Sequence, residues 1–184
     1  MRKLIFAINV TLDGCCDHTK GMGTDEVLEY HTRLLHDVDL VVFGRKTYQL
    51  MVPFWPDIAR SQSGTKPMND YATAFDSVKK LVISRSLDSV ADKNSRIARG
   101  ELQDAILELK QEPGKDILTG GVAVPTQLME LGLIDEYRVL IQPIVVGEGR
   151  RLFDGVGLQD RLHLKLIESK SLNSGVVALR YVKQ

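Results

Sequence analysis

The chain has 184 residues, of which 43% are hydrophobic and 26% are charged, a composition typical of one globular domain with a sizeable core. Lys and Arg together number 24, as do Asp and Glu, so the formal net charge is zero. This balance argues against a nucleic-acid binder, and no apolar run approaches the roughly 20 residues that span a bilayer. We therefore expect a cytoplasmic protein that binds neither nucleic acid nor membrane.

The first half of the chain alternates strand-like and helix-like segments. Apolar, β-branched runs predict strands at residues 3–10, 39–43 and 80–84. Apolar spacing predicts helices at 25–36, behind the N-cap residue Thr24, and at 45–51. The stretch from Pro53 to Pro67 is the least regular part of the sequence, and we expect a further helix near residues 69–75.

The second half continues this alternation and then changes character. We predict a short strand at 96–98, a helix at 101–110, a strand at 116–119 and a helix at 122–131. A long strand-like run at 136–146 is interrupted by Pro143, and residues 162–170 and 176–182 form a hairpin around Gly175. Alternating elements followed by an antiparallel edge predict one α/β domain over residues 1–184, with a mixed sheet.

Three strand-to-helix junctions give the strongest functional indication. The strand at 39–43 leads into Gly44-Arg45-Lys46-Thr47, and the strand at 80–84 ends at Ser84-Arg85. The strand at 116–119 leads into Gly120-Gly121, before Val122 and Ala123. If the strands are parallel, these tips share one sheet edge, where α/β proteins bind ligands. Glycines admit a close backbone approach, and cations at a helix N-terminus favour phosphate.

One ligand with several phosphates would use all three junctions, and we predict a dinucleotide, NADPH in particular. The guanidinium of Arg85 between hydroxyl groups suits a ribose 2′-phosphate. The G-x-G-x-x-G fingerprint is absent, which argues against a Rossmann dehydrogenase. The adjacent Cys15 and Cys16 are interpreted as reduced thiols, and the histidines lack metal-ligand spacing, so no metal is expected.

The order of short motifs along the chain resembles a known family. LDG, GRKTY, VISR, TGG, LIDEY and P-x-V-x-G-E-G-R-x-L-F follow one another over nearly the whole length. This order resembles the dihydrofolate reductase-like fold, and within it the RibD C-terminal reductase domain of bacterial riboflavin biosynthesis and its stand-alone relatives. The resemblance implies a three-layer α/β/α domain with a central, mostly parallel sheet and an antiparallel C-terminal hairpin, assembled as a homodimer.

The resemblance also implies an NADPH site at the strand tips. Ala7 and Ile8 would contact the nicotinamide amide, and Thr11, Leu12, Asp13 and Gly14 would lie beside the nicotinamide and the substrate. The remaining residues implied to contact the cofactor are Gly44, Arg45, Lys46 and Thr47 at its phosphates, Ser84 and Arg85 at its 2′-phosphate end, and Gly120, Gly121, Val122 and Ala123 at its pyrophosphate.

The chemistry expected is hydride transfer from NADPH to a C=N or C=O carbon of a small polar heterocyclic or ribosylamino substrate, as in 5-amino-6-(5-phosphoribosylamino)uracil reductase. Asp13 and Glu26 are the candidate catalytic residues. Tyr48 and Trp55 are candidate walls of the substrate pocket, and Arg150 is a candidate contact for a substrate phosphate.

Two alternatives remain open. One is a dihydrofolate or pterin reductase-like enzyme, although Leu28 occupies the position where dihydrofolate reductases place a carboxylate. Thr119 likewise replaces the acidic residue that riboflavin-pathway reductases often carry before the paired glycines. The other alternative is a protein that binds a nucleotide without turnover.

Overall fold

An eight-stranded sheet runs through the whole molecule in the computed structural model, which describes residues 1–184. The strands are β1 (Leu4–Thr11), β2 (Val38–Gly44), β3 (Lys79–Ile83), β4 (Ser95–Ile97), β5 (Asp116–Thr119), β6 (Glu136–Gln142), β7 (Leu164–Ser171) and β8 (Val177–Lys183). Their order is β4-β3-β2-β5-β1-β6-β8-β7. The first six strands are mutually parallel, and β8 is antiparallel to both β6 and β7. The predicted mixed sheet and C-terminal hairpin are confirmed.

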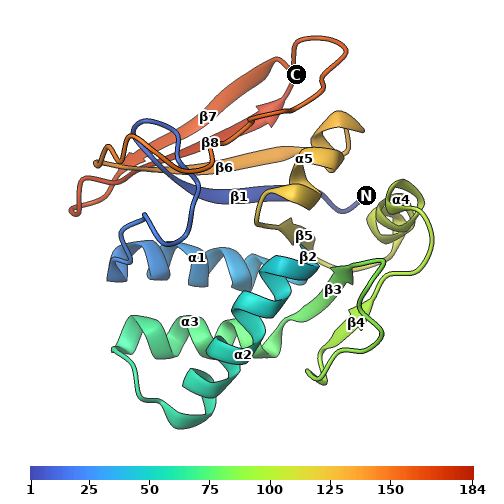
Figure 1. Cartoon of the computed structure of the whole chain (residues 1–184), viewed down its shortest axis with the longest axis horizontal. Helices are drawn as coiled ribbons and strands as arrows, with labels where there is room; N and C mark the ends of the chain where they lie inside the picture. The colour runs from blue at the N-terminus through green and yellow to red at the C-terminus, as the bar shows by residue number, and fades with distance from the viewer.

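Five helices cover the two faces of the sheet, as Figure 1 shows. They are α1 (Asp25–Asp37), α2 (Arg45–Ser61), α3 (Lys66–Ser77), α4 (Leu102–Gln111) and α5 (Ala123–Glu130). Buried residues of α1, α2 and α3 pack on one face, and those of α4 and α5 pack on the other. The result is the expected three-layer α/β/α arrangement, which leaves the carboxyl ends of the parallel strands to form a ligand site.

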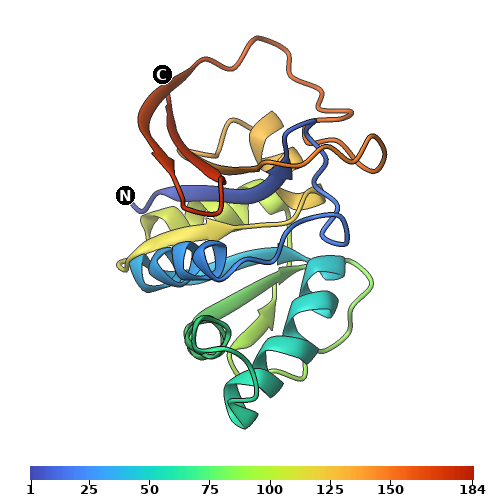
Figure 2. The same cartoon turned by 90° about the vertical axis from the view of Figure 1, so that its left-hand side faces the viewer.

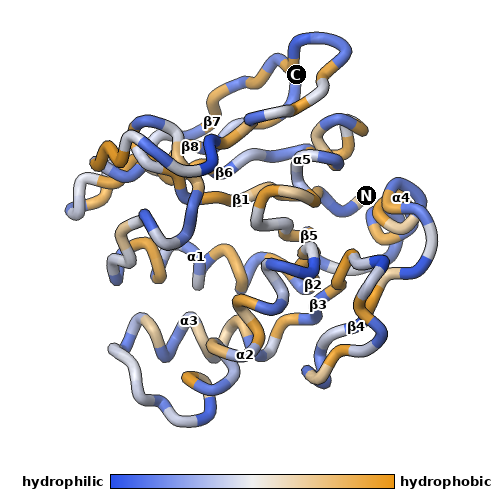
Figure 3. The backbone as a smooth tube through the Cα atoms, viewed as in Figure 1, coloured by the Kyte–Doolittle hydropathy of each residue, from blue (hydrophilic) through white to orange (hydrophobic).

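The central strand β1 shows why its sequence is a continuous apolar run. Leu4 and Phe6 join the cluster beneath α4 and α5, whereas Ile5 and Ala7 join the cluster beneath α1, α2 and α3. Because helices cover both faces, neither set of alternating residues faces water. Figure 3 shows the hydrophobic colour along β1.

Three elements differ in length by four residues or more from the sequence prediction. Helix α3 extends from Lys66 to Ser77, rather than over the predicted residues 69–75. Helix α2 continues ten residues beyond Met51, to Ser61, although it contains Pro53 and Pro56. Tyr48, Val52 and Pro56, spaced by four residues, are buried, and this packing outweighs the roughly 3 kcal/mol that an interior proline costs. Strand β6 ends at Gln142 rather than Val146, because Pro143 has no N–H to donate to the ladder.

The β7–β8 hairpin lies at the opposite end of the sheet from α2 and α3, as Figure 2 shows. Strand β7 is the edge strand, and its Leu166 and Ile167 are 49% and 47% exposed. The homodimer expected from the family resemblance stays a prediction. No helix is long and apolar enough to cross a membrane.

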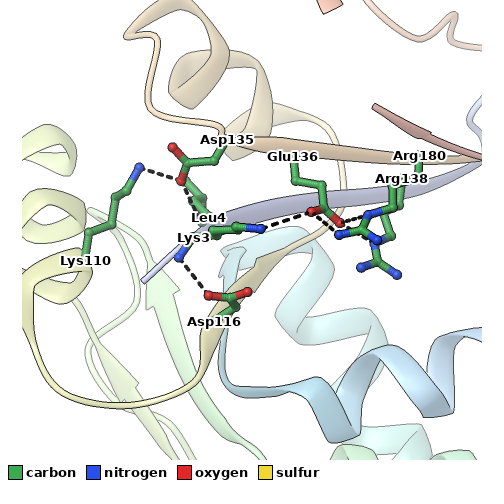
Figure 4. A network of polar contacts seen from close by, with 8 residues as sticks. All are labelled: Lys3, Leu4, Lys110, Asp116, Asp135, Glu136, Arg138 and Arg180. Atoms are coloured by element: carbon green, nitrogen blue, oxygen red, sulfur yellow. Dashed lines mark hydrogen bonds and ion pairs between the residues drawn. The ribbon is translucent and has the colours of Figure 1, made fainter. Parts of the chain in front are cut away.

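A polar network fixes the amino end of β1, away from the strand tips (Figure 4). The backbone N–H of Leu4 donates to Asp135, 2.7 Å away, and that carboxylate also pairs with Lys110 at 2.6 Å. Beside it, the buried carboxylate of Glu136 accepts from Arg138 at 2.7 Å and from Arg180 at 2.9 Å. These contacts join β1, β6, β8 and α4 and hold the register on which the tips depend.

Candidate functional site

The main cleft of the molecule has a volume of about 1100 Å³ and opens at the carboxyl ends of β1, β2, β3 and β5. Strand β5 lies between β1 and β2 in the sheet. The helices that precede and follow β5 in the chain, α4 and α5, cover one face of the sheet, whereas α1 and α2, which follow β1 and β2, cover the other. The connections therefore leave adjacent strand tips in opposite directions, which opens a crevice where ligands bind in α/β folds. All three predicted junctions line this one cleft.

The cofactor side of the cleft has a cationic rim, formed by Arg45, Lys46 and Arg85. The side chains of these three residues are exposed and form no ion pair or hydrogen bond within the chain. Gly44 caps α2 without a side-chain hydrogen bond, so the first N–H groups of this 17-residue helix are also free. Fixed positive charge beside free helix N–H groups is an environment that attracts phosphate.

The glycines bring the tips of β2 and β5 close together. Gly121 has a φ of +80°, and a Cβ there would overlap the Oγ1 of Thr47 at the start of α2. A Cβ on Gly44 would lie 3.2 Å from the side chain of Val124 in α5. A glycine is thus required at position 121, and the approach at Gly44 is tight; both glycines leave backbone N–H groups accessible from the cleft.

Most residues predicted to contact the cofactor line the cleft. They are Ala7, Ile8, Gly44, Arg45, Lys46, Thr47, Ser84, Arg85, Gly120, Gly121, Val122 and Ala123. Gly14 is not among the lining residues. Its carbonyl oxygen instead accepts a hydrogen bond from the N–H of Leu152.

The residues predicted to bind substrate divide into two groups. Thr11, Trp55 and Arg150 line the cleft. Leu12 does not, because its side chain is 67% exposed beyond the end of β1. Tyr48 is outside the cleft for the opposite reason: it is buried in the core, where its hydroxyl has no hydrogen-bond partner.

Neither predicted catalytic carboxylate lines the cleft, and Asp13 instead organises a loop. Its oxygens accept from the hydroxyl of Thr11 at 2.6 Å and from the N–H of Gly147 at 2.9 Å, and it pairs with Arg151 at 2.7 Å. These hydrogen bonds, that of Thr11 foremost and then that of Arg151, hold the pKa of Asp13 well below its ordinary value. The structure therefore places a saturated, ionised carboxylate here.

Glu26, in the first turn of α1, has a structural role like that of Asp13. Its carboxylate accepts from the N–H of Ser174 at 2.7 Å and from the N–H of Asn173 at 3.1 Å, both in the turn between β7 and β8. The hydrogen bonds of Ser174, followed by those of Asn173, lower the pKa of Glu26. Glu26 thus attaches the C-terminal hairpin to α1.

Sequence reasoning missed a polar pair inside the cleft, Asn9 on β1 and His31 on α1. The Nε2 of His31 lies 2.9 Å from the Oδ1 of Asn9, and burial lowers the pKa of His31 to about 4, so the imidazole is neutral near pH 7. The available indication was helical spacing, because His31 lies one turn after Leu28 and one before Leu35, which also line the cleft.

An aromatic lobe extends the cleft between α1, α2 and α3. The ring of Trp55 lies 4.5 Å from that of Tyr71, which stacks on Phe75 with centroids 6.1 Å apart. Leu28, Leu35 and Met51 complete this lining. The aromatic lobe exists only because α2 extends as far as Trp55 and α3 packs against it.

The fold and the cleft together define a dihydrofolate reductase-like α/β domain with its ligand site at the carboxyl edge of the sheet. The chain belongs to the RibD C-terminal domain family, whose model matches residues 2–178. It is also 30% identical over 184 residues to the Bacillus subtilis (strain 168) protein named Uncharacterized protein YyaP, an alignment that covers 98% of this chain and 94% of that protein.

Two solved structures share the fold. A Shewanella sp. PV-4 protein described provisionally as a riboflavin biosynthesis protein has a TM-score of 0.70 and 22% identity, with 99% of each chain covered. The Thermotoga maritima diaminohydroxyphosphoribosylaminopyrimidine deaminase/5-amino-6-(5-phosphoribosylamino)uracil reductase has a TM-score of 0.69 and 15% identity. That match covers 100% of this chain and 57% of the longer Thermotoga chain, so this chain corresponds to one part of it.

Proposed function

We propose that the protein is an NADPH-dependent reductase of a small ring compound. The observation that carries this proposal is the cationic rim, in which Arg45, Lys46 and Arg85 have no partner within the chain. Three unpaired cations at two neighbouring strand tips are suited to a ligand that brings several phosphates. The family and the printed name of the Thermotoga structure support the reductase class.

In this proposal two junctions hold the pyrophosphate of the cofactor and the third holds its 2′-phosphate. The N-terminus of α2, with Arg45 and Lys46, binds the phosphates that join the two nucleotides. Ser84 and Arg85, after β3, bind the 2′-phosphate, and the backbone at Gly120 and Gly121 approaches the pyrophosphate. The backbone of Ala7 and Ile8, in the centre of the sheet, contacts the nicotinamide amide. NADPH when bound supplies the hydride, and the residues of the chain orient it toward the substrate.

The proton that completes the reduction comes from water in this scheme. Asp13 and Glu26 lie outside the cleft and are held ionised by their hydrogen bonds, so we assign both a structural role. His31 lies in the cleft but is neutral, with a pKa of about 4, which makes it a hydrogen-bonding group rather than an acid near pH 7.

A binding experiment on Arg85 tests the cofactor assignment. NADPH and NADH are titrated into the wild type, Arg85→Ala and Arg161→Ala by isothermal titration calorimetry. Loss of one charge-assisted contact, about 1.5–3 kcal/mol, raises the Kd for NADPH about tenfold or more and leaves that for NADH unchanged. Arg161→Ala, which removes an exposed cation outside the cleft, is the matched control.

Equal affinity of the wild type for NADPH and NADH, or an Arg85→Ala variant with wild-type preference, contradicts the assignment. Turnover is measured separately, as NADPH oxidation across pterins, ribosylaminopyrimidines and small carbonyl compounds. Tight NADPH binding without oxidation of any of these would favour the alternative of a nucleotide-binding protein without turnover.

A further inference from the structure

The two ends of the cleft differ in chemical character. The cationic rim provides positive charge at the cofactor side. The aromatic lobe, which α2 lines with Met51 and Trp55 rather than with its first turn, contains no group that is charged near pH 7. Leu28, Met51, Trp55 and Tyr71 form the sides of the lobe, and Phe75 is almost fully buried at its floor. The cleft volume of about 1100 Å³ lies above the roughly 300–1,000 Å³ usual for one ligand pocket.

One polar pair adjoins the apolar lining. With Asn9 Oδ1 as acceptor, the Nε2 of neutral His31 carries the hydrogen and its Nδ1 remains a hydrogen-bond acceptor. Neither Nδ1 of His31 nor Nδ2 of Asn9 has a partner within the chain. The pair therefore offers one acceptor and one amide donor without any net charge.

A phosphorylated substrate would need a different lining. Phosphate carries close to two negative charges near neutral pH and is bound by Arg, Lys or helix N-termini. The cations that line the cleft at the start of α2 and after β3 belong to the cationic rim, and Arg150 lies on the loop after β6, beside Cys16. Removing phosphate charge from water into the aromatic lobe would be unfavourable.

We propose, on the basis of the reductase function above, that the substrate is an uncharged, unphosphorylated, planar nitrogen heterocycle, whose ring occupies the aromatic lobe and whose polar edge hydrogen-bonds the Asn9–His31 pair. The reaction adds hydride from NADPH to the carbon of a ring C=N bond and a proton from water to its nitrogen. The C=N π bond breaks, new C–H and N–H bonds form, and NADPH is oxidised to NADP⁺.

The chain provides its own reporter for this binding. Trp55 is the only tryptophan and lines the aromatic lobe against Tyr71, so a ring that enters the lobe changes its fluorescence. Quinoxaline, an unphosphorylated bicyclic heterocycle, and uridine 5′-monophosphate are titrated separately into the protein, with and without NADP⁺. Because NADP⁺ holds no hydride, both calorimetry and Trp55 fluorescence report binding without turnover.

We expect quinoxaline to bind at least tenfold more tightly than uridine 5′-monophosphate and to change the Trp55 emission. His31→Ala should weaken quinoxaline binding about two- to tenfold, as expected for one neutral hydrogen bond. His36→Ala, an exposed histidine on the same helix, should leave it unchanged. Met51→Ala should weaken binding in the lobe, whereas Gln49→Ala, exposed on the same helix and outside the cleft, should not. Thermal melts verify that each variant is folded, and Met51→Leu provides a conservative second variant.

The proposal is overturned if uridine 5′-monophosphate binds as tightly as quinoxaline, and more plainly if Arg150→Ala then weakens that binding. It is also overturned if quinoxaline binds without a change in Trp55 emission, because the ring is then elsewhere. Quinoxaline binding in the lobe together with no affinity for NADP⁺ or NADPH would support this ligand class while refuting the cofactor assignment, so the two proposals fail separately.

Discussion

Replacing Gly121 by alanine tests whether the tips of β2 and β5 require a glycine at their contact. The φ of +80° at Gly121 disfavours an L-residue, and the added Cβ would overlap Thr47 Oγ1. We take about 1.5 kcal/mol for the left-handed backbone and a similar ~1.5 kcal/mol for overpacking, or about 3 kcal/mol together. For a chain of 184 residues this lowers Tm by about 6–12 °C.

Differential scanning calorimetry of Gly121→Ala beside Gly120→Ala measures this effect. Gly120 is the matched control, since its φ is not positive and an added Cβ would be 3.8 Å from the nearest atom, the carbonyl oxygen of Ala7. Thr47→Ala combined with Gly121→Ala should recover the overpacking part but not the backbone part, which a double-mutant cycle separates. Equal Tm values for the two glycine variants would refute the reasoning.

Three other predictions concern titratable groups. Burial raises the pKa of Glu136, but hydrogen bonds from Arg180 and Arg138 lower it more, so its folded-state pKa is below the ordinary 4.5. The stabilisation that Glu136 contributes is therefore fully present above pH 4.5 and is lost as the pH falls through the lowered pKa of the folded state. Glu136→Gln should cost about 3 kcal/mol at neutral pH and flatten the acid limb of urea unfolding, and unchanged pH dependence would contradict the network. Burial places the pKa of His31 at about 4, below its ordinary 6.5, so the unfolded chain alone takes up a proton between these values. Stability should fall as pH drops from 6.5 to 4 in the wild type and fall less in His31→Gln, and parallel urea curves would exclude this titration. Asp13→Asn removes the ion pair with Arg151 and should lower Tm without changing the kcat of NADPH oxidation, whereas a lost kcat in a folded variant would restore a catalytic role.

The sequence by itself determined the elements and the edge at which a ligand site forms. Residues 4–8 and 40–43 are apolar without interruption because both faces of a central parallel strand are covered, and this pattern is local. Gly44 and Ser84 each follow such a run, and Gly120 follows a shorter one, Ile117-Leu118, after Thr119. Once the strands are parallel, the three positions must meet at one edge, as the cleft confirms.

Only the tertiary structure decided the roles of the polar side chains. Asp13 was predicted to be catalytic from its place at a strand tip, but its partners Val146 and Gly147 lie more than 130 residues later. Glu26 likewise meets Ser174 at a separation of 148 residues. Hydrogen-bond partners at such distances follow from the packing of whole elements, so no local pattern contains them.

The same reason explains the missed half of the site. Asn9 and His31 belong to different elements, and their contact depends on how α1 crosses β1. The aromatic lobe depends on α2 continuing through Pro53 until Trp55 reaches Tyr71 of α3. Local propensity opposes that extension, and the burial of one helix face against the sheet and α3 outweighs it, which is an energy that only the assembled fold supplies.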